Sequence, residues 1–361
     1  MSTEANQIRQ KLQKFLDDTK STPLSADDTV LKEVCQDVER ELNQQVTSEM
    51  VRLAHDIFGY MGKRGLEKRA SLHRRHMAVT QDMEERFWSN WHMVDSFAVL
   101  RQNREAVEEQ YKLYEWASRS LTDDHVLQTL YDSTQALCWV REGRIDEWYQ
   151  LYYGNLERLN KPGVARYTRC GYVRTGAEIA VQVERLTEAL TETERLERIN
   201  SEDINWDHHV PFWIGAITTR LGVYNKQEAW SRFDQVAAEA LTFVEKEVQK
   251  SDAGDSINSH NMSWAAHDIG VSLMWAKRYE QAKHLLEVAL KFRDMGATHF
   301  FLSACIWASE RDRPKTLYHL KIAQNMTADN TNRGFQNQFF LETSEFADVR
   351  DDKEFLEALG Q

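Results

Sequence analysis

Residues 263–296 read SWAAHDIGVSLMWAKRYEQAKHLLEVALKFRDMG, and the next 34 residues repeat their pattern of small and large side chains. Four pairs of positions carry the match at this spacing: Gly270 and Ala304, Leu273 and Trp307, Leu286 and Leu320, and Ala289 and Ala323. Small residues let two helices approach closely, and large apolar residues fill the space beside them. The 34-residue period therefore predicts pairs of helices in which each pair packs on the next.

This unit resembles the tetratricopeptide repeat, a helical hairpin of the same length. The resemblance rests on three segments: Ala266-x-x-Ile269-Gly270-x-x-Leu273, Ala282-x-x-x-Leu286 with Ala289, and the turn KRYEQA at 277–282. It implies an all-α fold, a right-handed α-solenoid of tetratricopeptide-like helical hairpins with an N-terminal helical extension. Hairpins are expected at 83–120, 123–160, 162–199, 204–250, 259–294 and 296–327, separated by short breaks rich in cap and turn residues.

The two ends of the chain depart from the repeat. Residues 1–82 contain helical periodicity without the 34-residue pattern and are expected to form an N-terminal helical bundle or cap. The hairpin array is expected over 83–330, followed by a C-terminal capping segment at 331–361. Within it, TSEFADVRDDKEFLEAL resembles the closing segment of bacterial tetratricopeptide arrays. A solenoid exposes an apolar face at its last hairpin, and four residues are predicted to cover that face: Phe346, Val349, Phe355 and Leu359.

Composition narrows the possible classes of protein. The chain has 361 residues, 42% of them hydrophobic, with only 15 glycines and 4 prolines, which excludes global disorder and disfavours a β-sandwich or barrel. The formal net charge of −12 argues against a general nucleic-acid role. Four widely spaced cysteines show no C-x-x-C motif. Neither a secretory signal nor an apolar run long enough to span a membrane is seen, so a cytoplasmic location is expected.

Known catalytic motifs for nucleotide binding, zinc hydrolysis or serine hydrolysis are absent from the sequence. His73 and His76 share a helix face, and with His55, Glu84 and Glu85 they have the ligand chemistry of a metal site. His73 and His76 lie inside a strongly basic run, which disfavours a bound cation. We therefore predict no catalytic residues, no metal and no cofactor.

That basic run has two interpretations. Its six cations are Lys63, Arg64, Lys68, Arg69, Arg74 and Arg75, with only Glu67 among them. In the first interpretation they form a solvated helix face whose compensating acids lie on a neighbouring helix. In the second they form a docking patch for an acidic partner.

The resemblance to tetratricopeptide repeats also implies a ligand-binding groove, because the first helix of each hairpin lines the concave surface. Transferred to this sequence, the groove residues are Trp264, His267, Met274, Trp275, Phe301 and Cys305. Such an apolar, aromatic surface favours a protein or peptide ligand, helical or apolar in character.

The leading hypothesis is thus a non-enzymatic scaffold that binds a protein or peptide ligand in its concave groove, with neither nucleic acid nor membrane as a partner. One alternative is a ligand-switched regulator that uses the N-terminal helical bundle as its effector. Another is an all-α enzyme with a metal or small-molecule pocket between helical hairpins.

Overall fold

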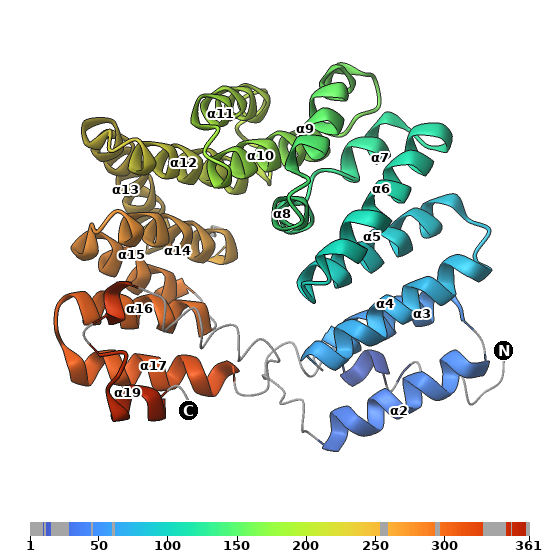
Figure 1. Cartoon of the computed structure of the whole chain (residues 1–361), viewed down its shortest axis with the longest axis horizontal. Helices are drawn as coiled ribbons and strands as arrows, with labels where there is room; N and C mark the ends of the chain where they lie inside the picture. The colour runs from blue at the N-terminus through green and yellow to red at the C-terminus, as the bar shows by residue number, and fades with distance from the viewer. Residues whose placement is uncertain are drawn as a thin grey trace. The chain divides into compact units, whose positions relative to one another are not determined.

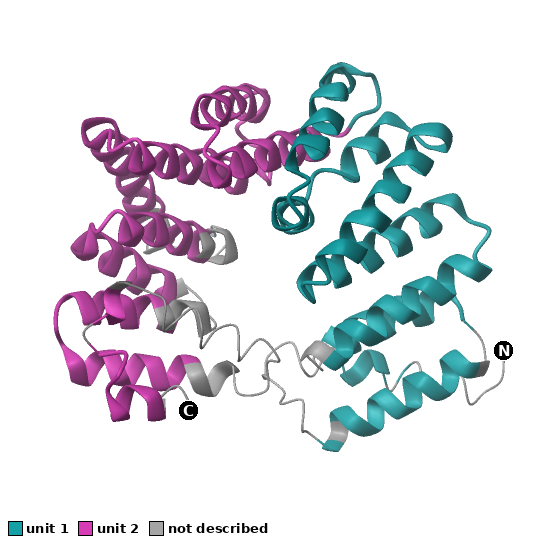
Figure 2. Cartoon of the chain, viewed as in Figure 1, with its two compact units in different colours: residues 1–164, 329–331 teal, residues 165–328, 332–361 magenta. Residues whose placement is uncertain are grey.

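The computed structural model confirms the all-α class. It describes residues 10, 12–15, 29–44, 46–59, 62–252, 259–292, 297–327, 344–347 and 349–358. Within these ranges the secondary structure is helical, with turns between helices and no β-strand. The chain divides into two compact units (Figure 2), residues 1–164 with 329–331 and residues 165–328 with 332–361.

The first unit is a succession of helices joined by short turns (Figure 1). Its elements are α2 (Thr29–Gln44), α3 (Ser48–Gly59), α4 (Gly62–Val79), α5 (Met83–Val99), α6 (Asn103–Ser120), α7 (Asp123–Gln128), α8 (Ser133–Arg141), α9 (Ile145–Gly154) and the 3₁₀-helix η1 (Leu156–Asn160). Helix α4 packs along both α3 and α5, so the packing of helices continues through the expected boundary at residue 82. The apolar faces of α2 and α3 form one core cluster, to which Leu72 of α4 also belongs.

The region 123–160 departs from the expected simple hairpin. It holds three short helices and a 3₁₀ turn instead of two longer helices. The interruption occurs at Asp132, whose carboxylate accepts a hydrogen bond from Gln135 N at 2.9 Å and so starts a new helix, α8. An N-cap of this kind satisfies an amide that would otherwise lack a partner in the first helical turn.

The second unit contains four helical hairpins and the closing segment (Figure 1). Its elements are α10 (Arg166–Gln182), α11 (Leu186–Asn200), α12 (His209–Lys226), α13 (Trp230–Asp252), α14 (Ser259–Trp275), α15 (Tyr279–Phe292), α16 (Ala297–Ser309), α17 (Arg313–Thr327), η2 (Ser344–Phe346) and α19 (Lys353–Ala358). Helices α10, α12, α14 and α16 pack in sequence, each against the next. One continuous apolar cluster runs from Ile217 to Phe355.

A single turn type recurs in both units. At each of six hairpin turns one residue has a left-handed backbone, with φ between 53° and 68°: Arg101, Gly143, Glu184, Glu228, Lys277 and Arg311. At the α14–α15 turn, Lys277 N donates to Met274 O and Arg278 N donates to Leu273 O, at 2.8 and 2.9 Å. This pattern is the Schellman motif that ends a helix and reverses the chain. The same pair of bonds recurs 34 residues later, at Arg311 and Asp312.

Gly270 performs the close-packing role predicted for it. A Cβ added there would lie 3.3 Å from Leu286 Cδ2 and 3.4 Å from Ala282 O, both on α15. Helices α14 and α15 therefore approach each other at a point where only a hydrogen atom fits without displacement. Ala282 and Leu286 are themselves fully or almost fully buried.

The closing segment covers the last hairpin as expected. Phe346 and Phe355 are completely buried, with ring centroids 5.2 Å apart, and belong to the same core cluster as Leu320 of α17. Val349 packs against this cluster, whereas Leu359 lies outside the described residues. Two aromatic rings thus replace the next hairpin of the array. Among the helices that the structure describes, none combines the length and the apolar character needed to cross a bilayer.

The turn at Gly143 provides a test of the left-handed constraint. Its φ is 68°, and a Cβ added there would meet no atom within 4 Å, so the effect of Gly143→Ala is conformational alone. We expect Gly143→Ala to destabilise the chain by about 1 kcal/mol. Gly154→Ala is the matched control, because Gly154 is equally uncrowded but ends helix α9 without a positive φ. Urea unfolding followed by circular dichroism measures both; equal midpoints for the two variants would contradict the assignment.

Candidate functional site

The first unit contains a cleft of about 550 Å³ formed by helices α3, α4 and α5. Its walls are made by Ser48, Val51, Arg52, His55, Asp56, His73, His76, Glu84, Glu85, Trp88, Ser89 and His92. This size is typical of sites for small molecules or peptide segments. Four of the twelve residues are histidines, in a cleft that contains only two apolar side chains.

Helical spacing explains why these side chains meet. His73 and His76 are one turn apart on α4, and Ser89 and His92 are one turn apart on α5. Residues three apart share a helix face. The α4–α5 turn sets the register, since the Asp82 carboxylate caps α5 by accepting from Glu85 N at 3.0 Å. The two pairs therefore face each other across the hairpin.

Three imidazole rings form the centre of the cleft. The ring centroids of His55 and His73 are 5.1 Å apart, those of His55 and His92 are 4.6 Å apart, and those of His73 and His92 are 5.1 Å apart. We call these three residues the histidine triad. Each helix of the cleft contributes one ring, so the triad exists only when α3, α4 and α5 are packed together.

A chain of hydrogen bonds links the triad to a carboxylate. His55 Nδ1 lies 2.8 Å from His73 Nε2, and His73 Nδ1 lies 3.4 Å from Ser89 Oγ. Ser89 Oγ lies 2.8 Å from His76 Nδ1. The chain ends where His76 Nε2 lies 3.4 Å from Ser48 Oγ, whose hydroxyl bonds to Glu85.

The ionised carboxylate of Glu85 determines which atom donates and which accepts in each hydrogen bond of this network. An ionised carboxylate only accepts, and a neutral imidazole has one donor and one acceptor nitrogen. Ser48 therefore donates to Glu85 and accepts from His76 Nε2, which leaves His76 Nδ1 to accept from Ser89. Ser89 in turn accepts from His73 Nδ1, and His73 Nε2 accepts from His55 Nδ1. The tautomer assigned in this way places an unprotonated lone pair on His55 Nε2.

The imidazoles are held in the neutral form. Burial lowers the pKa of His73 to about 2, assisted by the neighbouring His92 and His55. Burial lowers the pKa of His55 to about 3 and that of His92 to about 4, with the Arg69 guanidinium acting in the same direction. Conversely, the hydroxyl of Ser48, ahead of that of Thr80, holds the pKa of Glu85 below its usual range. The cleft thus combines neutral rings with a charged carboxylate.

Arg69 is the cation beside the triad. Its Nε donates to His55 O at 2.6 Å, and its guanidinium occupies the space that a side chain at Gly59 would fill. Burial lowers the pKa of Arg69, whereas Asp56 and Asp95 raise it. Burial, together with Asp132, raises the pKa of Asp95 to about 6.

The mouth of the cleft carries an aromatic ring and a second carboxylate. Glu84 accepts from Trp88 Nε1 at 2.8 Å and lies 2.8 Å from Nε2 of His125, a residue of α7. Trp88 is half-buried, and its ring centroid lies 6.3 Å from that of His92. The indole plane is therefore fixed beside the triad by a bond to its own helix.

Three of the predicted metal-ligand candidates, His55, His73 and His76, do share this cleft with Glu84 and Glu85. Among the residues described, however, no group of three or more histidine, cysteine, aspartate or glutamate side chains is arranged to hold a metal ion. A physical reason is that His55 and His73 point ring nitrogens at each other, so one lone pair is occupied by the partner's N–H. His92, Ser89 and Ser48 were not predicted from the sequence, although the spacing of Ser89 and His92 on α5 matches that of His73 and His76 on α4.

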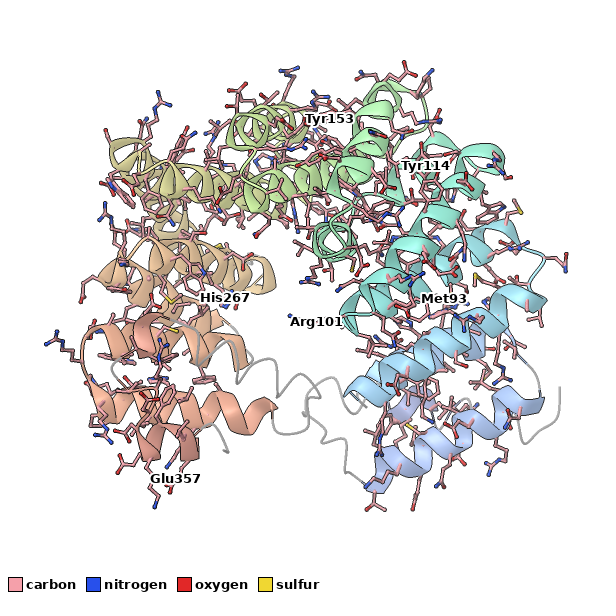
Figure 3. The ribbon with its side chains drawn as sticks, in the orientation of Figure 1. Met93, Arg101, Tyr114, Tyr153, His267 and Glu357 are labelled. Carbon is pink, nitrogen blue, oxygen red and sulfur yellow. The ribbon has the colours of Figure 1, made fainter. Side chains whose placement is uncertain are left out.

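The predicted groove residues of the second unit lie in different environments. Met274 and Cys305 are completely buried in the core. His267 lies on α14 (Figure 3), and its exposed fraction is 5%. Trp275 is 42% exposed. The side chains of Trp264 and Phe301 lie outside the described residues.

The predicted basic patch is partly occupied by bonds within the first unit. Lys68 forms an ion pair with Glu39 of α2, and Arg75 donates to Leu42 O at 2.6 Å. Arg69 points into the cleft region as described above, whereas Arg64 and Arg74 are exposed. The side chain of Lys63 lies outside the described residues. Lys68 and Arg75 thus bond α4 to α2, and Arg69 bonds α4 to α3.

The repeated Schellman turns and the 34-residue spacing indicate an array of helical hairpins. The hairpins are tetratricopeptide-like. Two solved structures are similar, each with 9% sequence identity: a tetratricopeptide repeat protein from Parabacteroides merdae ATCC 43184 and the apo form of RapI. The first has a TM-score of 0.44 and covers 92% of this chain and 100% of that chain; the second has 0.46 and covers 89% and 85%. No protein-family model matches the sequence, and no curated protein matches it.

The lowered pKa of His73 predicts acid sensitivity. An unfolded histidine takes up a proton near pH 6.5, whereas folded His73 does so only near pH 2, so the stability that neutral His73 contributes is complete above pH 6.5 and lost as the pH falls. Each pH unit below 6.5 should cost about 1.4 kcal/mol per such proton. Between pH 6 and 4.5 we expect the unfolding free energy of His73→Gln to change less steeply with pH than that of the parent. The difference in slope should correspond to about one proton fewer taken up on unfolding. An unchanged slope in urea titrations would contradict the burial of this ring.

Proposed function

We propose that this chain is a ligand-binding helical-hairpin protein whose binding site is the histidine cleft of α3, α4 and α5. The observation that carries the proposal is the cleft itself, about 550 Å³ in volume, with side chains from three helices held in one hydrogen-bonded network. Preorganised polar groups bind with less loss of conformational entropy than mobile ones. The ligand that we infer is a peptide or protein segment, as for the leading sequence hypothesis.

The protonation state of the network favours binding over proton transfer. A general base works best when its pKa lies near the operating pH. With the pKa of His55 lowered to about 3 and that of His92 to about 4, these rings accept hydrogen bonds at neutral pH without taking up protons. This supports a recognition role for the cleft.

A second location for a ligand remains in the second unit. Trp275 is a large aromatic residue that is 42% exposed at the end of α14, as an anchor in a peptide groove should be. Because Met274 and Cys305 are buried in the core, the groove proposal rests on Trp275 and on its neighbours along α14 and α16. For the basic patch, a docking role for an acidic partner rests on Arg64 and Arg74.

Site-specific photocrosslinking in the host cell tests the proposal directly. The photoreactive amino acid p-benzoylphenylalanine is placed at Arg52, an exposed residue of the cleft wall, and in separate variants at Trp275 and at Arg104, which is exposed on α6. We expect one discrete crosslinked polypeptide from position 52 and none from position 104. Excess unmodified protein should compete with the crosslink, because both versions bind the same segment.

The three positions separate the alternatives. A discrete crosslink at 275 without one at 52 would move the site to the second unit. The same set of products at all three positions, or none at any of them, would contradict a specific binding function.

A further inference from the structure

We propose that the histidine cleft recognises an aliphatic ammonium group, with His55 Nε2 and a ring nitrogen of His92 as its neutral hydrogen-bond acceptors. The inference deepens the proposed function, because it states which chemical group of the ligand enters the cleft. It rests on the direction of the hydrogen-bond chain, on the charge of the cleft wall and on the fixed indole of Trp88.

The first observation is the set of acceptors without partners. The series of hydrogen bonds between Glu85 and His55 makes His55 Nδ1 the donor to His73, so His55 Nε2 carries a lone pair. Among the described residues, neither His55 Nε2 nor the ring nitrogens of His92 have a protein partner, and both rings line the cleft. The neutral His92 ring has one acceptor nitrogen beside its N–H, and an ammonium group, with three donors and no acceptor, can donate to that nitrogen and to His55 Nε2.

The second observation is the charge of the wall. Three carboxylates, of Asp56, Glu84 and Glu85, line the cleft against the single guanidinium of Arg52. Adding Arg69 and Asp95, which lie next to the wall, leaves the excess at two negative charges. The imidazoles are neutral, and Arg69 disfavours positive charge at His55 and His92. The carboxylates of the wall act in the opposite direction, and a cationic ligand would offset their excess.

The third observation is the indole of Trp88. Its Nε1 donates to Glu84, which fixes the ring beside His92 at the mouth of the cleft. An aromatic face attracts a cation, and more strongly when the site is shielded from water. The alkyl stem of an amine would pack on the same ring, as long cationic side chains do on apolar surfaces.

A metal ion is the competing cation. It would need several lone pairs directed at one point, and the described residues include no such group. Glu84 is already bonded by Trp88 and His125, and His73 uses both ring nitrogens within the network. An ammonium group needs only acceptors within hydrogen-bond distance, which His55 and His92 supply.

Isothermal titration calorimetry on the full chain tests the inference with three probes. Cadaverine supplies a free alkylammonium, acetyl-Ala-Lys-Ala-amide supplies the same group on a peptide, and acetyl-Ala-norleucine-Ala-amide keeps the alkyl stem without the charge. We expect binding of cadaverine or of the lysine peptide, or of both, and the stronger probe identifies the source. Binding of the norleucine peptide as tight as that of the lysine peptide would overturn the inference.

Two variants locate the bound amine. His92→Phe keeps an aromatic ring but removes its acceptor, and should lower the affinity for the tighter-binding probe about tenfold or more. Asp56→Asn alters an exposed residue of the cleft wall and should lower the affinity for the same probe about threefold, through the lost charge alone. The matched control is His208→Phe, an exposed histidine of the second unit, which should bind like the parent. Circular dichroism confirms that each variant is folded.

Three further results would overturn the inference. The first is amine affinity that neither cleft variant changes, and the second is an equal loss of affinity in His208→Phe. The third is stoichiometric Zn²⁺ binding that displaces the amine and is lost in His92→Phe. The crosslinking experiment is independent of this one. A discrete crosslink at position 52 with no amine binding would leave the proposed function intact and remove only the ammonium assignment.

Discussion

The left-handed residue that closes six of the described hairpin turns is the constraint on which both units depend, whereas the α4–α5 turn is set by the Asp82 cap. A helix cannot bury its apolar stripe alone, so the next helix must return along it within a few residues. One residue with φ near +60° and two amide-to-carbonyl bonds achieve this reversal at six turns. Only one of the six is glycine, so at the other five the packing of the two helices must outweigh the cost of the left-handed conformation.

Packing by hairpins also explains how a polar site can exist in so small a unit. The α4–α5 pair brings His73 and His76 opposite Ser89 and His92, and α3 adds His55, whose ring contacts those of His73 and His92. None of these rings has a full set of partners on its own helix. The network is therefore complete only when all three helices are in place, and its polar groups fix their relative register as well as filling space.

The repeat could be predicted from sequence because it depends on local spacing. The positions around Gly270 and the turn at Lys277 recur 34 residues later as Ala304 and Arg311, and the structure shows the same turn at both. The burial of Met274 and Cys305 could not be predicted, since helical periodicity does not say which stripe faces the next hairpin. His92 was missed for the same reason: its partners lie on α3 and α4, and only tertiary packing brings them within reach.

Three imidazoles lie in mutual contact, with His73 buried and His55 and His92 half-buried. Polar rings that are partly withdrawn from water lose hydrogen bonds to it, whereas apolar side chains of similar size would pack there without that loss. His73 and His76 recover their bonds through Ser89, but His55 and His92 keep lone pairs that no described side chain uses. Acceptors left unused in an otherwise satisfied network are the groups that a ligand can satisfy. A donor entering the cleft would complete a chain of bonds that already has its direction set by Glu85.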